Sequence, residues 1–162
     1  MLTGERADLV QLLNRQRGFL RFTVQNLTDE QAASQPVPST TLSLGGLIKH
    51  VSATEQSWYD FATGAEASQA GQENWMDAFR MVEGETLAGL LADYEKVAAR
   101  TDDLIATADL DASFPLPDAP WFEKGASWSV RHVLIHLIAE ISQHAGHADI
   151  IREAIDGQKT MG

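Results

Sequence analysis

The residues WSVRHVLIHLIAEISQHAGHADIIREAIDG (128–157) decide the fold class of this chain. Apolar positions recur there at steps of three and four residues and include Val133, Leu137, Ile141 and Ile151. This spacing is typical of an amphipathic helix with one buried face. Ser127 or Ser129 is the expected N-cap, and Gly157 the expected left-handed C-cap. The stretch therefore predicts a helix of bundle length ending near residue 156, with Asp149, Arg152 and Glu153 on its solvated side.

Three more stretches of the chain have the same helical spacing of apolar residues. They are 3–26, 43–63 and 85–108. A capping box at Thr28–Gln31 predicts a short helix between the first two, and residues 73–82 predict another short helical piece after a loop at 64–72. The connection 109–126 holds three prolines and is long for a compact domain. We therefore predict an all-α four-helix bundle, one domain over residues 1–157 with a flexible tail at 158–162.

Composition excludes several classes of partner and site. Twelve Lys and Arg against 23 Asp and Glu give a net charge of −11. Binding to nucleic acid or to an anionic membrane requires clustered basic residues, so neither partner is expected. The chain has no cysteine, which excludes disulfides, thiolate metal sites and a thiol nucleophile of its own. With no apolar run of signal-peptide or membrane-span length, we expect a cytoplasmic protein.

Four of the five histidines fall in the last predicted helix. With His136 set to zero on a helical wheel, His147 falls at about 20°, Glu140 at about 40° and His144 at about 80°. This arc is shared with the apolar residues that face the interior of the bundle, where an unpaired carboxylate is costly. The steps of four and three residues between Glu140, His144 and His147 allow these side chains to share one divalent ion.

A further ligand has to come from another helix, and His50 is the one histidine outside the last helix. Three protein ligands with an open position are typical of a catalytic metal site. The alternative is that the histidines are partly buried residues bonded to neighbours, with Glu140 and His144 a simple ion pair. His132 is expected to face solvent without a role, and His136 either supports the site or has no part in it.

Two other features have a structural and a functional interpretation. Gly45 and Gly46 indicate close packing against another segment, since no strand or Lys-Ser/Thr pattern makes them a phosphate loop. Trp58 is predicted to pack in the core or to wall a pocket. Trp121 and Phe122, in the proline-rich connection, either cover the metal end as a lid or pin a long loop.

The segments TLSLGGLIKHVSATEQSWY (41–59) and 128–157 resemble the DinB-like superfamily of metal-binding four-helix bundles. The resemblance spans the domain and implies a bundle with one long crossover connection. It also implies one metal ligand from the second helix, which is His50 here, and two from the last helix, which are Glu140 and His144. Many relatives have His where this chain has Glu140, and the maleylpyruvate isomerase branch has Glu. His147 lies where many relatives have Gln, so it replaces or supplements Glu140.

The resemblance further implies the chemistry. Members of this superfamily include transferases and isomerases that use a small thiol such as mycothiol, bacillithiol or glutathione, with zinc, nickel or iron as the expected metal. Because the chain has no cysteine, the thiol has to arrive as a co-substrate and attack a small electrophile. The alternative is a non-catalytic, stress-related metal-binding bundle. A homodimer is expected from the pairing of many relatives.

Overall fold

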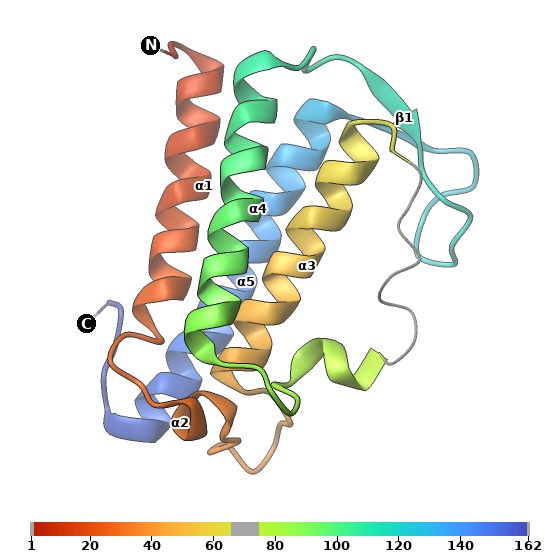
Figure 1. The fold of residues 1–162 in the computed structure, drawn as a ribbon. Helices are drawn as coiled ribbons and strands as arrows, with labels where there is room; N and C mark the ends of the chain where they lie inside the picture. The colour runs from red at the N-terminus through yellow and green to blue at the C-terminus, as the bar shows by residue number, and fades with distance from the viewer. Residues whose placement is uncertain (1, 66–74, 162) are drawn as a thin grey trace.

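The computed structural model describes residues 2–65 and 75–161 and contains four long helices (Figure 1). These are α1 (Glu5–Phe22), α3 (Leu44–Ala62), α4 (Leu87–Thr107) and α5 (Val130–Asp156). Two short helices accompany them, α2 (Asp29–Ala33) and the 3-10 helix η1 (Trp75–Phe79). The prediction of an all-α four-helix bundle is confirmed. The predicted loop at 64–72 lies almost entirely outside the described residues.

The four helices do not alternate in direction. In Figure 1, α1 and α5 run one way and α3 and α4 run the other. The connection between the parallel helices α3 and α4, residues 63–86, is therefore the long crossover that the family resemblance implies. Helix α3 packs against both α4 and α5, and α1 packs against α5 and α4. Because α3 and α5 are antiparallel neighbours, early residues of α3 face late residues of α5.

Local side chains cap the helices, and the caps of α2 and α5 are the predicted ones. Ser43 accepts a hydrogen bond from the amide of Gly46 at the start of α3, and Ser129 does the same for His132 at the start of α5. Thr28 and Gln31 form both bonds of the capping box. Gly157 ends α5 in the left-handed conformation with φ of 81°.

The connection between α4 and α5 contains a short two-stranded ribbon that the sequence does not predict. Strand β1 (Ser113–Pro115) pairs antiparallel with β2 (Ser127–Ser129), so that Phe114 lies opposite Trp128. Strands of three residues are too short to show the alternation that identifies a strand in a sequence. The ribbon returns the chain from its proline-rich loop directly into the N-cap of α5.

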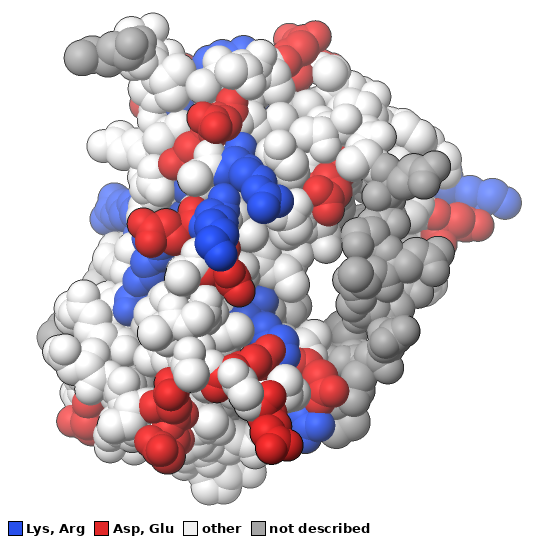
Figure 2. Space-filling model, in the orientation of Figure 1, with Lys and Arg blue, Asp and Glu red and all other residues white. Residues whose placement is uncertain are grey.

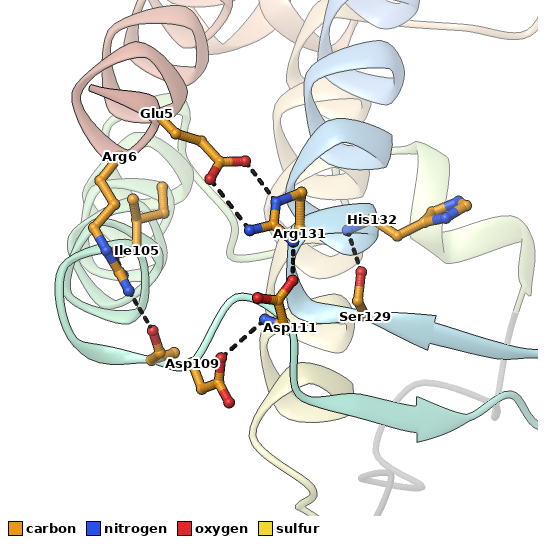
Figure 3. Close-up of polar contacts among 9 residues, drawn as sticks. Glu5, Arg6, Ile105, Asp109, Asp111, Ser129, Arg131 and His132 are labelled. Carbon is orange, nitrogen blue, oxygen red and sulfur yellow. Dashed lines mark hydrogen bonds and ion pairs between the residues drawn. The ribbon is translucent and has the colours of Figure 1, made fainter.

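An ionic cluster fixes the start of α5 against α1 and the end of α4 (Figure 3). Arg131 donates to both carboxylate oxygens of Glu5 and to Asp111. Arg6 donates to the last carbonyl groups of α4, among them that of Ala108 at 2.8 Å. These contacts join three helix termini at one end of the bundle.

Two arginines are buried in the bundle. Arg17 of α1 is 1% exposed and pairs with Glu55 of α3, which is fully buried. Arg152 of α5 is 3% exposed and donates to the carbonyl oxygens of Thr23 and Gln25. The prediction that Arg152 faces solvent is wrong: its guanidinium satisfies carbonyl groups that follow the last turn of α1.

Helix η1 packs directly on the first turn of α3. A Cβ atom on Gly46 would lie 1.8 Å from the carbonyl oxygen of Phe79, and one on Gly45 would lie 2.2 Å from the sulfur of Met81. The two glycines therefore permit a close approach of the chain, which confirms the packing interpretation. This close approach also places Phe79 next to the following turn of α3.

The surface carries both signs of charge. On the face shown in Figure 2, Lys and Arg are interleaved with Asp and Glu, and the described residues there form no continuous basic patch. Over the part of the chain that the structure describes, no helix is both long and apolar enough to span a membrane.

Candidate metal centre

His50 of α3 and His144 of α5 meet between the two helices. Their ring centroids are 4.8 Å apart, and the rings are nearly perpendicular, at 80°. Both side chains are half-buried. The antiparallel packing of α3 and α5 thus brings together the two histidines that the sequence places on different helices.

Glu140 and His147 both approach His144, but from opposite sides of its ring. The Nδ1 atom of His147 lies 3.4 Å from Nδ1 of His144. A carboxylate oxygen of Glu140 lies 3.9 Å from the other ring nitrogen, Nε2. The nitrogen of His144 nearest to His147 is therefore Nδ1, and the one nearest to Glu140 is Nε2.

The fit of these donors to a metal ion is partial. Within residues 2–65 and 75–161, no group of three or more His, Cys, Asp or Glu side chains is arranged to hold an ion. The 3.4 Å separation of the two Nδ1 atoms nevertheless matches that of two neighbouring ligands in a tetrahedral zinc site, about 3.4 Å for Zn–N bonds of about 2.05 Å. The donor types suit a first-row divalent ion.

Burial keeps the paired imidazoles neutral. Burial is the main cause that lowers the pKa of His50 to about 4, and the neighbouring His144 lowers it further. Burial also lowers the pKa of His144, where His147 acts in the same direction and Glu140 opposes it. Near pH 7 both rings are therefore uncharged, and an uncharged ring has a free nitrogen lone pair for a metal or a proton donor. A salt bridge between Glu140 and a charged His144 does not form at this pH.

Phe79 and Thr54 define the orientation of His50. The Phe79 ring stacks on the imidazole with a centroid distance of 4.0 Å and an interplanar angle of 22°. The hydroxyl of Thr54, one turn along α3, lies 3.5 Å from Nε2 of His50. Sequence analysis missed both partners. Thr54 follows His50 at the i+4 step and is recognisable in retrospect, whereas Phe79 reaches His50 only through the packing of η1 on α3.

The other two histidines belong to an aromatic cluster nearer the N-terminus of α5. Trp58 of α3 stacks on Trp128 with centroids 4.9 Å apart and planes 17° apart, and it contacts the edge of His136 at 5.0 Å. His132 is exposed, as predicted, and stacks on Trp128 at 4.1 Å. His136 therefore lies one turn before Glu140 on α5 and beside the Trp58 indole.

A cavity of about 490 Å³ lies beside this cluster, at the C-terminal end of α3. Its aromatic walls are Trp58, Phe61, Trp121 and Phe122. The structure thus places Trp58 at the wall of a pocket, one of its two predicted roles. Trp121 and Phe122 line this pocket and do not stack on the His50 ring, which Phe79 covers instead.

The fold and these motifs define the class of protein: a four-helix bundle of the DinB-like superfamily. The model of the mycothiol-S-transferase family matches residues 8–157, and the chain belongs to that family. The chain is similar to the crystal structure of a conserved protein from Enterococcus faecalis, with a TM-score of 0.76 and 15% sequence identity. The superposition includes 97% of this chain and 100% of that one. At this identity the likeness shows the shared fold alone. A search of curated proteins gave no match.

Proposed function

We propose that this protein is a metal-dependent transferase that joins a low-molecular-weight thiol of the mycothiol type to a small electrophile. The observation that carries the proposal is the neutral, half-buried pair His50 and His144 in a member of the mycothiol-S-transferase family. The absence of cysteine from the chain supports a thiol that arrives as co-substrate. The alternative reaction within the same proposal is isomerisation of a double bond, in which the thiol adds to the substrate and is then eliminated.

In this proposal His50 and His144 hold a divalent ion, zinc or else nickel or iron, together with Glu140 or His147. Such an ion, when bound, lowers the pKa of a coordinated thiol so that the thiolate is the reacting form. The chain's own residues contribute orientation. Phe79 and Thr54 fix the His50 ring, and burial of the histidines keeps them in the unprotonated form that can bind.

The position of Glu140 gives it one of two tasks. If the ion is bound by Nδ1 of His144 together with His147, the carboxylate accepts a hydrogen bond from Nε2–H of His144 and orients the ring. If the ion is bound by Nε2, Glu140 itself is the third ligand and His147 has no direct part. The family resemblance favours Glu140, whereas the 3.4 Å separation of the Nδ1 atoms favours His147.

A second candidate is a non-catalytic, stress-related metal-binding bundle. It is favoured by the finding that no group of three ligands is arranged to hold an ion in the described part of the chain. A purely structural ion would raise the melting temperature of the protein by mass action without creating affinity for a thiol. Thiol binding that depends on the metal therefore separates the two candidates.

The test is calorimetric titration of zinc, nickel and iron(II) into chelator-treated protein, followed by titration of mycothiol, bacillithiol and glutathione into the metal-loaded form. We expect one ion per chain and metal-dependent heat with one of the thiols. His50→Ala and His144→Ala should both abolish stoichiometric metal binding while circular dichroism shows intact helices. The matched control is His132→Ala, an exposed histidine on the same helix as His144.

Two more variants decide the third ligand. Loss of metal in Glu140→Gln with retention in His147→Ala identifies the carboxylate, and the opposite result identifies His147. Full metal occupancy in His50→Ala would show that the cross-helix ligand is wrongly assigned. Metal binding without heat from any of the three thiols would leave the structural role and refute the transferase.

A further inference from the structure

The cavity at the end of α3 has the size and the lining of a small-molecule site. At about 490 Å³ it falls within the range of about 300–1,000 Å³ that is usual for ligand pockets. Besides the four aromatic residues, Pro115 from the α4–α5 connection contributes to the wall, and none of the described residues that line the cavity is charged. Such a lining favours a neutral, planar, apolar group, because aromatic rings and prolines offer contact area but few hydrogen bonds.

Trp58 and Trp121 differ in how firmly their neighbours hold them at the cavity wall. Trp58 has the Trp128 ring stacked behind it and the edges of Phe61 and Phe122 against it, at 5.4 and 6.3 Å. Trp121, in contrast, is 76% exposed. A large indole left in water next to an apolar cavity gains contact area when a ligand fills that cavity. The pocket is therefore preformed on the α3 side and completed by Trp121 on the loop side.

The cavity and the histidine pair lie along the same side of α3. With His50 at zero on the helical wheel, Thr54 falls at about 40°, Trp58 at about 80° and Phe61 at about 20°. Trp58 and Phe61 follow His50 by eight and eleven residues, which is roughly 12–17 Å along the helix axis. A molecule that has one end at the histidines and the other in the cavity therefore has to extend over about this length on this side of α3.

We propose that this cavity binds the planar, apolar end of the electrophilic co-substrate, whose reacting carbon lies at the His50–His144 pair. The inference rests on the proposed thiol-transfer function and deepens it by naming the substrate class: elongated electrophiles that carry an aryl or similar conjugated group remote from the reacting carbon. In the conjugation itself, for example with an epoxide, the thiolate sulfur bonds to carbon, the carbon–oxygen bond breaks, and the released oxygen takes a proton from water.

The first test measures the cavity without any chemistry. Fluorescence titration with the neutral probe N-phenyl-1-naphthylamine should show one site per chain. Ser57→Phe places a ring into the cavity from an exposed position of α3, and we expect at least about a tenfold loss of affinity. Trp121→Ala should lower the affinity for the probe by about tenfold. Ile150→Ala, which removes another exposed apolar side chain, is the control and should bind as the wild type does.

The second test links the cavity to the reaction. With metal-loaded protein and mycothiol, kcat/KM should be higher for an epoxide with an aryl group at the end of its alkyl chain than for the same epoxide without the aryl group. Trp121→Ala should lower kcat/KM for the aryl epoxide and so remove this preference, whereas Ile150→Ala should keep it. Circular dichroism and urea unfolding of Ser57→Phe and Trp121→Ala check that both variants fold.

Unchanged probe binding in Ser57→Phe and Trp121→Ala would overturn the proposal. Displacement of the probe by mycothiol alone would also overturn it, because the cavity would then bind the thiol. Metal and mycothiol binding without probe binding would overturn the cavity assignment and leave the proposed function standing. Probe binding without metal or thiol binding would refute the proposed function, and with it the identification of the occupant as an electrophile. His50→Ala separates these cases, since it should lose metal and keep the probe.

Discussion

The buried ion pair between α1 and α3 predicts a large loss of stability when one partner is neutralised. Arg17 is 1% exposed and Glu55 fully buried, and the guanidinium donates to both oxygens of the carboxylate. Breaking such a pair typically costs about 3–5 kcal/mol, because the remaining charge stays buried without its partner. Arg17 keeps one ion pair, with Asp102 at 2.7 Å. We therefore expect Glu55→Gln to lower the free energy of unfolding by about 3 kcal/mol, the lower end of that range.

Urea unfolding followed by circular dichroism measures this change. At a slope of about 2 kcal/mol/M, a loss of about 3 kcal/mol moves the midpoint down by roughly 1.5 M. The control is Asp93→Asn, which breaks the Lys96–Asp93 pair on the surface, where both side chains are more than two-thirds exposed, and should cost less than about 1 kcal/mol. A midpoint shift in Glu55→Gln no larger than in Asp93→Asn would refute the reasoning.

The double replacement of Arg17 and Glu55 by Met and Leu provides the second check. Apolar residues of similar volume remove both buried charges together, so most of the lost stability should return. A double variant less stable than Glu55→Gln would show that the pair is net stabilising. The pair also joins α1 to the helix that carries His50, since Glu55 lies on α3 about 140° from His50 on the helical wheel.

Three further predictions follow from single contacts. In metal-free protein, stability should fall as the pH drops from 6.5 to about 4, because the unfolded chain takes up a proton that folded His50 does not. Urea unfolding across that range should show a smaller loss in His50→Leu, by at most about 3 kcal/mol, and the remainder comes from groups such as His144, whose pKa burial also lowers. Gly46→Ala should lower the melting temperature by displacing Phe79, whereas Gly18→Ala, with open space around its Cβ, should raise it slightly. Arg152→Met should cost about 2–3 kcal/mol in urea unfolding by leaving two carbonyl oxygens unpaired.

Regular helices were predictable because their start and stop signals are local. Ser129 and Gly157 cap α5 as predicted, since a cap depends on residues within one turn. The Arg17–Glu55 pair was not predicted. Glu55 falls on the buried stripe of α3, and a carboxylate there requires a partner, but its partner lies on another helix 38 residues earlier.

Arg152 was predicted to face solvent from the same helical periodicity that correctly predicted the helices. Helical periodicity describes a side chain relative to its own helix axis and says nothing about which backbone groups of another segment remain unsatisfied. The end of α1 leaves carbonyl groups pointing at α5, and Arg152 is long enough to reach them. The ribbon between β1 and β2 was likewise beyond prediction, because it depends on pairing across an intervening loop.

The choice between Glu140 and His147 shows where spacing stops being informative. Steps of four and three residues from His144 place both side chains on one arc of α5, so periodicity treats them as equal candidates. An imidazole, however, has two nitrogens directed to opposite sides, and here each faces a different candidate. Sequence spacing cannot tell which nitrogen points where, because the orientation of the ring is set by neighbours such as His50. Metal binding by Glu140→Gln and His147→Ala would therefore identify the third ligand of the proposed site and, with it, the nitrogen of His144 that faces the ion.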